Sequence, residues 1–160
     1  MHICTRSLLK SEISKNPEVG RIIANSLDVG SLVPDHIVIS LVEQRLKQSD
    51  CRVNGWILDG FPQTDPQINL LATLKIKPSL VCMLEQPEEE SIRRLTNRRV
   101  DPTTGIYYNL EILPPRDEAT ASRLVELAED KEANVRLRCN TWNEHVPNLE
   151  EAFKNMLLNV

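Results

Sequence analysis

The chain has 160 residues and a formal net charge of −4, with 41% of its residues hydrophobic and 26% charged. This length gives a single domain with a sizeable core, and the composition is that of a soluble globular protein. The negative charge argues against a general nucleic-acid surface, although local basic clusters can still bind a small phosphate ligand. No apolar run approaches the roughly 18 residues of a membrane helix and no signal-peptide pattern is found, so we expect no membrane partner.

The cysteines are far apart in the sequence and form no paired spacing of the kind that binds metals. They are Cys4, Cys51, Cys82 and Cys139. This pattern predicts reduced core thiols in an intracellular, cytoplasmic protein.

The first 50 residues are predicted to be mainly helical. Residues 2–4 are interpreted as the tail of a strand that leads into a helix at Thr5. Apolar residues recur at helical spacing through residues 19–27, and Gly30 is a plausible C-cap. The turn of residues 30–35 precedes another helix, and taken alone this pattern fits a helical hairpin without a ligand.

Residues 55–62 change from a strand pattern to a tight turn. The apolar run 56–58 predicts a strand buried on both faces, and it is followed by Asp59 and Gly60. A carboxylate at the C-terminal end of a parallel strand lies where open α/β sheets bind ligands. An ordinary turn after a core strand is the alternative. We expect a helix from Thr64 to about residue 74, and a second strand over residues 80–84.

We predict a helix whose N-terminus carries Glu88, Glu89 and Glu90. Four arginines follow in the same helix, and they are Arg93, Arg94, Arg98 and Arg99. Arg94 and Arg98 are four residues apart, so on one helical face they could approach a single polyanion. A solvated charged face is the alternative. Beyond a hairpin turn at residues 104–105, we expect a long helix around residues 135–146 and a final amphipathic stretch over residues 149–157.

The central turn carries a family resemblance. Asp59-Gly60-Phe61-Pro62, preceded by an apolar triplet and followed by Gln67, resembles the signature of the adenylate kinase family, with Gln63 where the family has arginine. The resemblance implies a three-layer α/β fold, a parallel sheet flanked by helices as in P-loop nucleoside kinases. It also implies transfer of the terminal phosphoryl group of ATP to AMP with Mg²⁺ as the cofactor.

The resemblance also assigns the AMP-binding residues, which are Thr5, Lys10, Leu32, Val33, Gly60, Gln63 and Gln67. Thr5 matches the threonine of the family's Ser-Thr-Gly-Asp pattern. Lys10 replaces an arginine, and an ammonium neutralises a phosphate without forming the bidentate fork of a guanidinium.

The implied catalytic residues are three arginines and one aspartate. Arg94, Arg98 and Arg138 would face the transferring phosphates, and Asp59 would orient the hydration shell of magnesium through water. The family has a further arginine in its lid. When this sequence is aligned with the family without a gap, Leu127 occupies that position, and Arg123 could replace the arginine only in a shifted register. No cysteine-bound zinc is expected in the lid, because no Cys occurs from residue 83 to residue 138.

The implied organisation is one adenylate-kinase-like domain over residues 1–160. It would comprise a helical monophosphate-binding part over about residues 5–50, a core made of residues 51–99 and 116–160, and a short lid over residues 100–115.

The fold is expected to be incomplete at both ends. The five glycines form no Gly-x-x-x-x-Gly-Lys loop, which grips phosphates in this family, and the resemblance covers residues 3 to about 153, ending before the family's last strand. The family's first strand lies between the strands ending at Asp59 and Glu85, so its loss would leave two open edges.

This suggests a fragment, an internal piece of a multi-domain kinase (some are associated with cilia), or a chain whose sheet a partner or missing segment completes. Two functions follow: a phosphotransferase that is weak or inactive alone, or a catalytically dead binding or structural module.

Overall fold

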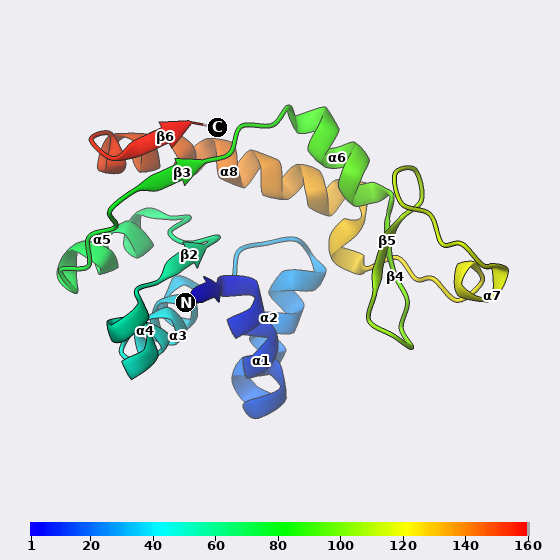
Figure 1. The fold of residues 1–160 in the computed structure, drawn as a ribbon, viewed down its shortest axis with the longest axis horizontal. Coiled ribbons are helices and arrows are strands. Elements are labelled where there is room, and N and C mark those ends of the chain that lie inside the picture. Colours follow the sequence, from blue (N-terminus) through cyan, green and yellow to red (C-terminus); the bar gives the residue numbers. More distant parts are fainter. Residues whose placement is uncertain (160) are drawn as a thin grey trace.

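Helices make up most of the chain and surround short strands in this computed structural model, which describes residues 1–159 (Figure 1). The α-helices are α1 (Thr5–Lys15), α2 (Pro17–Asp28), α3 (Asp35–Leu46), α4 (Ser49–Asn54), α5 (Asp65–Thr73), α6 (Glu88–Thr96), α7 (Glu118–Ala121) and α8 (Glu132–Phe153), with a 3₁₀ turn η1 (Ala128–Asp130). The strands are β1 (His2–Cys4), β2 (Ile57–Asp59), β3 (Val81–Met83), β4 (Arg98–Val100), β5 (Tyr107–Asn109) and β6 (Leu157–Asn159).

The strands of residues 1–159 form three separate pairs. β1 is parallel to β2, β3 is parallel to β6, and β4 is antiparallel to β5. The continuous parallel sheet that the resemblance implies is therefore divided into two parallel pairs, which share no ladder hydrogen bond. Helices cover these pairs, as in an α/β fold, and β4–β5 with α7 projects away from them (Figure 1).

The expectation that residues 56–58 form a strand buried on both faces is wrong. β2 pairs along one edge only, and the side chain of Ile57 is 67% exposed. The second predicted strand is likewise uncovered, because Leu80 and Leu84 at its two ends are 57% and 77% exposed. Both apolar segments thus lack a neighbour on one side.

The C-terminal expectation is also wrong, because a final strand is present. α8 ends at Phe153, and after a short turn β6 pairs with β3 in register, Leu157 beside Val81. The predicted amphipathic stretch over residues 149–157 is therefore divided between the end of α8 and the start of β6. Backbone hydrogen bonding to β3, including 2.9 Å from the Val81 nitrogen to the Met156 oxygen, favours the extended form.

The arginine-bearing helix is shorter than predicted. α6 ends at Thr96, so Arg98 and Arg99 lie in β4 and do not share a helical face with Arg94. The physical reason is long-range pairing, because Arg98–Val100 form an antiparallel ladder with Tyr107–Asn109. The acidic first turn of α6 is confirmed.

The core lies between α1, α2, α3 and α5, with the buried end of α8. Ile3, Ile23 and Val42 are among its least exposed side chains. Cys51 belongs to this core, whereas Cys82 is exposed, so the prediction of four core thiols is wrong for Cys82. No helix within residues 1–159 combines the length and apolarity that a bilayer crossing requires.

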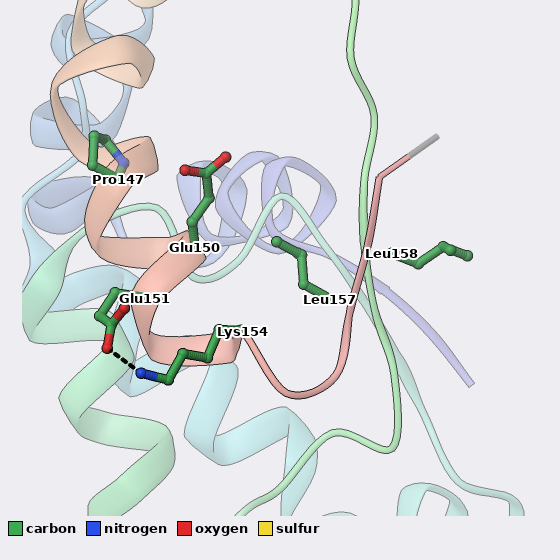
Figure 2. Close-up of a pocket in the computed structure, with 6 residues that line it drawn as sticks. All are labelled: Pro147, Glu150, Glu151, Lys154, Leu157 and Leu158. Atoms are coloured by element: carbon green, nitrogen blue, oxygen red, sulfur yellow. Dashed lines mark hydrogen bonds and ion pairs between the residues drawn. The ribbon is translucent and has the colours of Figure 1, made fainter.

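One hollow of the described chain lies at its C-terminal end. It measures about 480 Å³ and is lined by α8 side chains from Pro147 to Lys154 and by Leu157 and Leu158 of β6 (Figure 2). Glu151 and Lys154 pair across one side at 2.6 Å. None of the expected site residues lines it, so it is not the candidate site.

Candidate functional site

A second pocket, of about 320 Å³, is bounded by the start of α1, the turn before α3, the turn after β2 and one face of α8. Its apolar lining includes Leu27, Leu32, Val33 and Val38. Its polar lining includes Thr5, Arg6, Asp59, Gly60, Gln63, Gln67 and Arg138. Residues from four distant segments therefore meet around one space with an apolar part and a cationic part.

The strand–helix junction at Thr5 is tied to the turn after β2. The Thr5 hydroxyl lies 3.2 Å from the carbonyl oxygens of both Asp59 and Gly60 and can donate to either. Gly60 has a φ of +70°, a conformation that disfavours any residue with a Cβ. This turn and the first turn of α1 thus form one wall of the pocket.

Gln67 is almost fully buried, and both ends of its amide are bonded. Its Nε2 donates to Asp35 Oδ1 at 2.7 Å, while its Oε1 accepts from the Gln63 backbone nitrogen at 2.8 Å. The Thr64 hydroxyl donates to the same Asp35 oxygen at 2.8 Å and therefore does not cap α5. The network joins α3 to α5 and fixes the loop that carries Gln63.

Three arginines gather around η1, and two of them, Arg6 and Arg138, line the cationic part of the pocket. Arg98 forms a bidentate pair with Asp130, at 2.8 and 2.6 Å, and Asp130 has no exposed surface. Arg138 donates from Nη1 to the Glu129 carbonyl at 2.5 Å. Arg6 forms an ion pair with the Glu129 carboxylate.

The three guanidiniums repel one another. Burial lowers the pKa of Arg6, and the nearby positive charges of Arg98 and Arg138 lower it further. Burial likewise lowers the pKa of Arg138, with Arg98 again opposing its charge. An anion that entered this part of the pocket would relieve this repulsion.

Three expected site residues lie outside the pocket lining, namely Lys10, Arg94 and Arg98. Lys10 is exposed, and its Nζ is 3.4 Å from the Tyr107 hydroxyl of β5. Arg94 remains on α6, where its Nε donates to Glu90 at 2.6 Å. Hydrogen bonds from Arg93 and then Arg94 lower the pKa of Glu90 to about 2.

Arg123, considered as a substitute lid arginine, is engaged elsewhere. It forms a bidentate pair with Asp101, which has no exposed surface, at 2.8 and 2.7 Å. The hydrogen bond from Arg123 lowers the pKa of Asp101. The side chain thus closes the β4–β5 hairpin instead of facing the pocket.

Asp59 lines the pocket and is accessible to a ligand. Its carboxylate is 57% exposed and lies 3.0 Å from His2 Nε2. Residues 1–159 contain no group of three or more metal-ligating side chains. Asp59 therefore fits Mg²⁺ only as a contact through water, with most ligands coming from nucleotide phosphates and solvent.

A family model for adenylate kinase matches residues 1–157. The chain belongs to the adenylate kinase family. The match extends beyond the expected limits of 3 and 153. Adenylate kinases are phosphotransferases, so the family expectation from the central turn is confirmed.

Two plant relatives have a similar level of identity. The chloroplastic adenylate kinase of Zea mays is 38% identical over 159 residues, covering 99% of this chain and 72% of the relative. A probable chloroplastic adenylate kinase 2 of Oryza sativa subsp. japonica is 38% identical over 160 residues. That alignment covers the whole of this chain and 55% of the relative, so the chain spans about half of its length.

Sequence reasoning missed Arg6. It stands between Thr5 and Ser7, where the adenylate kinase pattern Ser-Thr-Gly-Asp has glycine. The available signal was its place directly after an expected ligand residue, at the junction of β1 and α1.

Proposed function

We propose that the chain binds a nucleoside monophosphate, AMP by the family resemblance, as the acceptor in phosphoryl transfer from ATP. The observation that carries this proposal is the pocket itself, which gathers six of the seven expected AMP residues together with Arg138. Its apolar lining suits a base, and its cationic part suits a phosphate.

Each group has a role in this proposal. Leu32 and Val33 contact the base, and Gln67 holds the loop beside it. Arg138 faces the phosphates from α8, while Arg98, fixed by Asp130, and Arg94 act on the donor side. Phosphoryl transfer needs mainly positioning and neutralisation of charge, which guanidiniums supply without covalent chemistry.

Magnesium enters with ATP and neutralises charge on its phosphates. The exposed Asp59 carboxylate would hold the hydration shell of the ion in this arrangement. His2 lies beside that carboxylate and would be displaced or shared when the ion is present.

We propose that phosphoryl transfer by the 160-residue chain alone is weak. No glycine in the sequence belongs to a Gly-x-x-x-x-Gly-Lys loop, and Lys10 and Gln63 replace two acceptor-side arginines. A single preorganised contact can contribute 100-fold or more in rate, on the order of one oxyanion-hole donor. A binding module that keeps only the acceptor pocket is the second candidate, favoured by the same observations.

We also propose that an extended segment, from a longer form or from a partner, completes the sheet between β2 and β3. Its support is the unpaired second edge of each strand and the exposure of Ile57 and Leu84. Family topology places a parallel strand at this position.

Calorimetric titration of the 160-residue chain with AMP, and separately with ATP and Mg²⁺, tests the proposal, together with a coupled assay of ADP formation. We expect AMP binding, little ATP binding and slow turnover. Failure to bind AMP would overturn the acceptor role. Rapid turnover would instead overturn the proposal that transfer by the chain alone is weak.

A further inference from the structure

Arg6 extends from the first turn of α1 into the wall of the acceptor pocket. It lies beside Thr5 and contributes to the same lining as Gln63 and Arg138. A glycine at this position, as in the family pattern, would leave that part of the wall without a charge.

The two positions that resemblance assigns to the acceptor phosphate carry little positive charge into this space. Gln63 is neutral, and its backbone nitrogen is bonded to Gln67. Lys10 points to Tyr107 and is not part of the lining. Among the lysines and arginines of residues 1–159, those that line the pocket are Arg6 and Arg138.

Among the described residues, Arg6 has the Glu129 carboxylate as its ion-pair partner. The buried Nη2 of Arg6 contacts the Glu129 carboxylate in this ion pair. Arg138 adds a second positive charge, and its Nη1 donates to the neutral backbone carbonyl of Glu129. At the pocket wall the Glu129 carboxylate thus pairs with Arg6, whereas Arg138 donates to a neutral carbonyl and has the Asp130 carboxylate nearby.

A phosphate matches this arrangement better than a single carboxylate does. A nucleoside monophosphate carries about two negative charges near pH 7, and its oxygens accept bidentate hydrogen bonds from guanidinium groups. The Glu129 side chain is mostly buried, so it remains close to Arg6 as a competing anion until a ligand arrives.

We propose that Arg6, together with Arg138, binds the phosphate of the acceptor nucleotide, and that this phosphate displaces the Glu129 carboxylate from Arg6. The inference rests on the proposed function, because it assigns a substrate contact within the same pocket. It gives this chain a phosphate ligand in place of the guanidinium missing at Gln63.

The test is calorimetric titration of the 160-residue chain with AMP and with adenosine, which lacks the phosphate. In Arg6→Gln, AMP affinity falls by about 10- to 100-fold, the size expected for a charged hydrogen-bonded contact, and adenosine affinity stays within about twofold. In Glu129→Gln, which removes the competing charge at nearly constant volume, AMP affinity is equal to or higher than that of the wild type.

The two variants are expected to change AMP affinity differently, downward in Arg6→Gln and not downward in Glu129→Gln, and this difference separates a ligand role of Arg6 from a structural role. Arg6→Gln and Glu129→Gln break the same ion pair, so a structural role would weaken AMP and adenosine binding in both variants. Arg21→Gln removes an equal charge from an exposed position on α2 and serves as the control, with AMP affinity within about twofold of the wild type.

Two failures are distinguishable. If the wild type binds AMP and Arg6→Gln binds it equally well, or if both ion-pair variants lose AMP and adenosine affinity alike, the Arg6 inference is wrong and the acceptor pocket stands. If the wild-type chain does not bind AMP, the proposed function and the inference are both wrong. Circular dichroism of each variant establishes that the compared chains are folded.

Discussion

At the scale of single residues, the pocket depends on one buried amide. Gln67 satisfies the Asp35 carboxylate on one side and the Gln63 backbone on the other. Because an amide has one accepting and one donating end, this pairing also fixes its orientation. Few residue types could serve both neighbours, which makes Gln67 a sensitive position.

We expect Gln67→Leu to destabilise the fold by about 1 to 3 kcal/mol, because it removes two hydrogen bonds, leaving the Gln63 backbone nitrogen without its partner and Asp35 with Thr64 alone. Urea unfolding followed by circular dichroism measures the change. Gln48→Leu is the matched control at an exposed position without a capping hydrogen bond, and its effect should be within about 0.5 kcal/mol. Equal effects of the two substitutions would contradict this account.

The expected AMP residues could be named because their signature is local, and the structure brings six of them to one pocket. Arg6 could not be found in this way, because its significance depends on Glu129 and Arg138, which lie more than 120 residues away. The roles of all these residues remain predictions until ligand binding is measured.

At the scale of elements, the β4–β5 hairpin is closed by a buried ion pair. Asp101 follows β4 and accepts hydrogen bonds from Arg123, from the Thr104 hydroxyl and from the Thr103 backbone. Val100 and Val125 exchange backbone hydrogen bonds on the same side. The carboxylate thus connects the hairpin to the segment that follows α7.

This pair makes stability depend on pH. The hydrogen bond from Arg123 lowers the pKa of Asp101 below its ordinary value of 3.8, so the stabilisation is complete above about pH 4 and is lost as the pH falls toward the lowered pKa. We therefore expect Asp101→Asn to have a lower urea midpoint than the wild type at pH 6. The two midpoints should converge toward pH 2, whereas a constant difference across this range would exclude the ionised pair as the cause.

The contact between α1 and α2 requires a residue without a side chain. A Cβ on Gly20 would lie 2.8 Å from the carbonyl oxygen and 2.9 Å from the Cα of Ile13, and both are backbone atoms. Such overlap forces the helices apart, although alanine is otherwise the better helix former.

We predict that Gly20→Ala destabilises the chain by about 1 to 3 kcal/mol through this overlap. Asn25→Ala, at an exposed position of the same helix, should instead stabilise it by about 0.7 kcal/mol or less. Thermal unfolding of both variants measures the difference. A stabilising effect of Gly20→Ala would mean that α1 and α2 are packed less closely than described.

The helices were more predictable than the strands because their signals are local. The apolar stripe of residues 19–27 and the Thr64 boundary correctly indicated α2 and α5. The end of α6 was missed because it depends on pairing with β5, more than ten residues downstream. β6 was not predicted, because a short apolar run fits either a helix or a strand, and only pairing with β3 decides between them.

At the scale of the whole molecule, the two parallel pairs present unpaired edges. Within residues 1–159, β2 pairs only with β1, and β3 pairs only with β6. Ile57 and Leu84 add exposed apolar surface at 67% and 77%. Open strand edges with apolar side chains are templates for pairing with another chain.

We therefore expect the isolated chain to self-associate as its concentration rises, and sedimentation velocity measures this directly. Ile57→Lys and Leu84→Lys should shift the population toward monomer, because a charged side chain at a strand edge disfavours pairing with a second copy. Val53→Lys, at an 81% exposed position on α4 away from the strands, is the matched control and should leave association unchanged. A wild-type chain that stays monomeric at every concentration, or lysine variants that associate as the wild type does, would show that these edges are covered in solution. In that case the proposed segment between β2 and β3 would lose its main support.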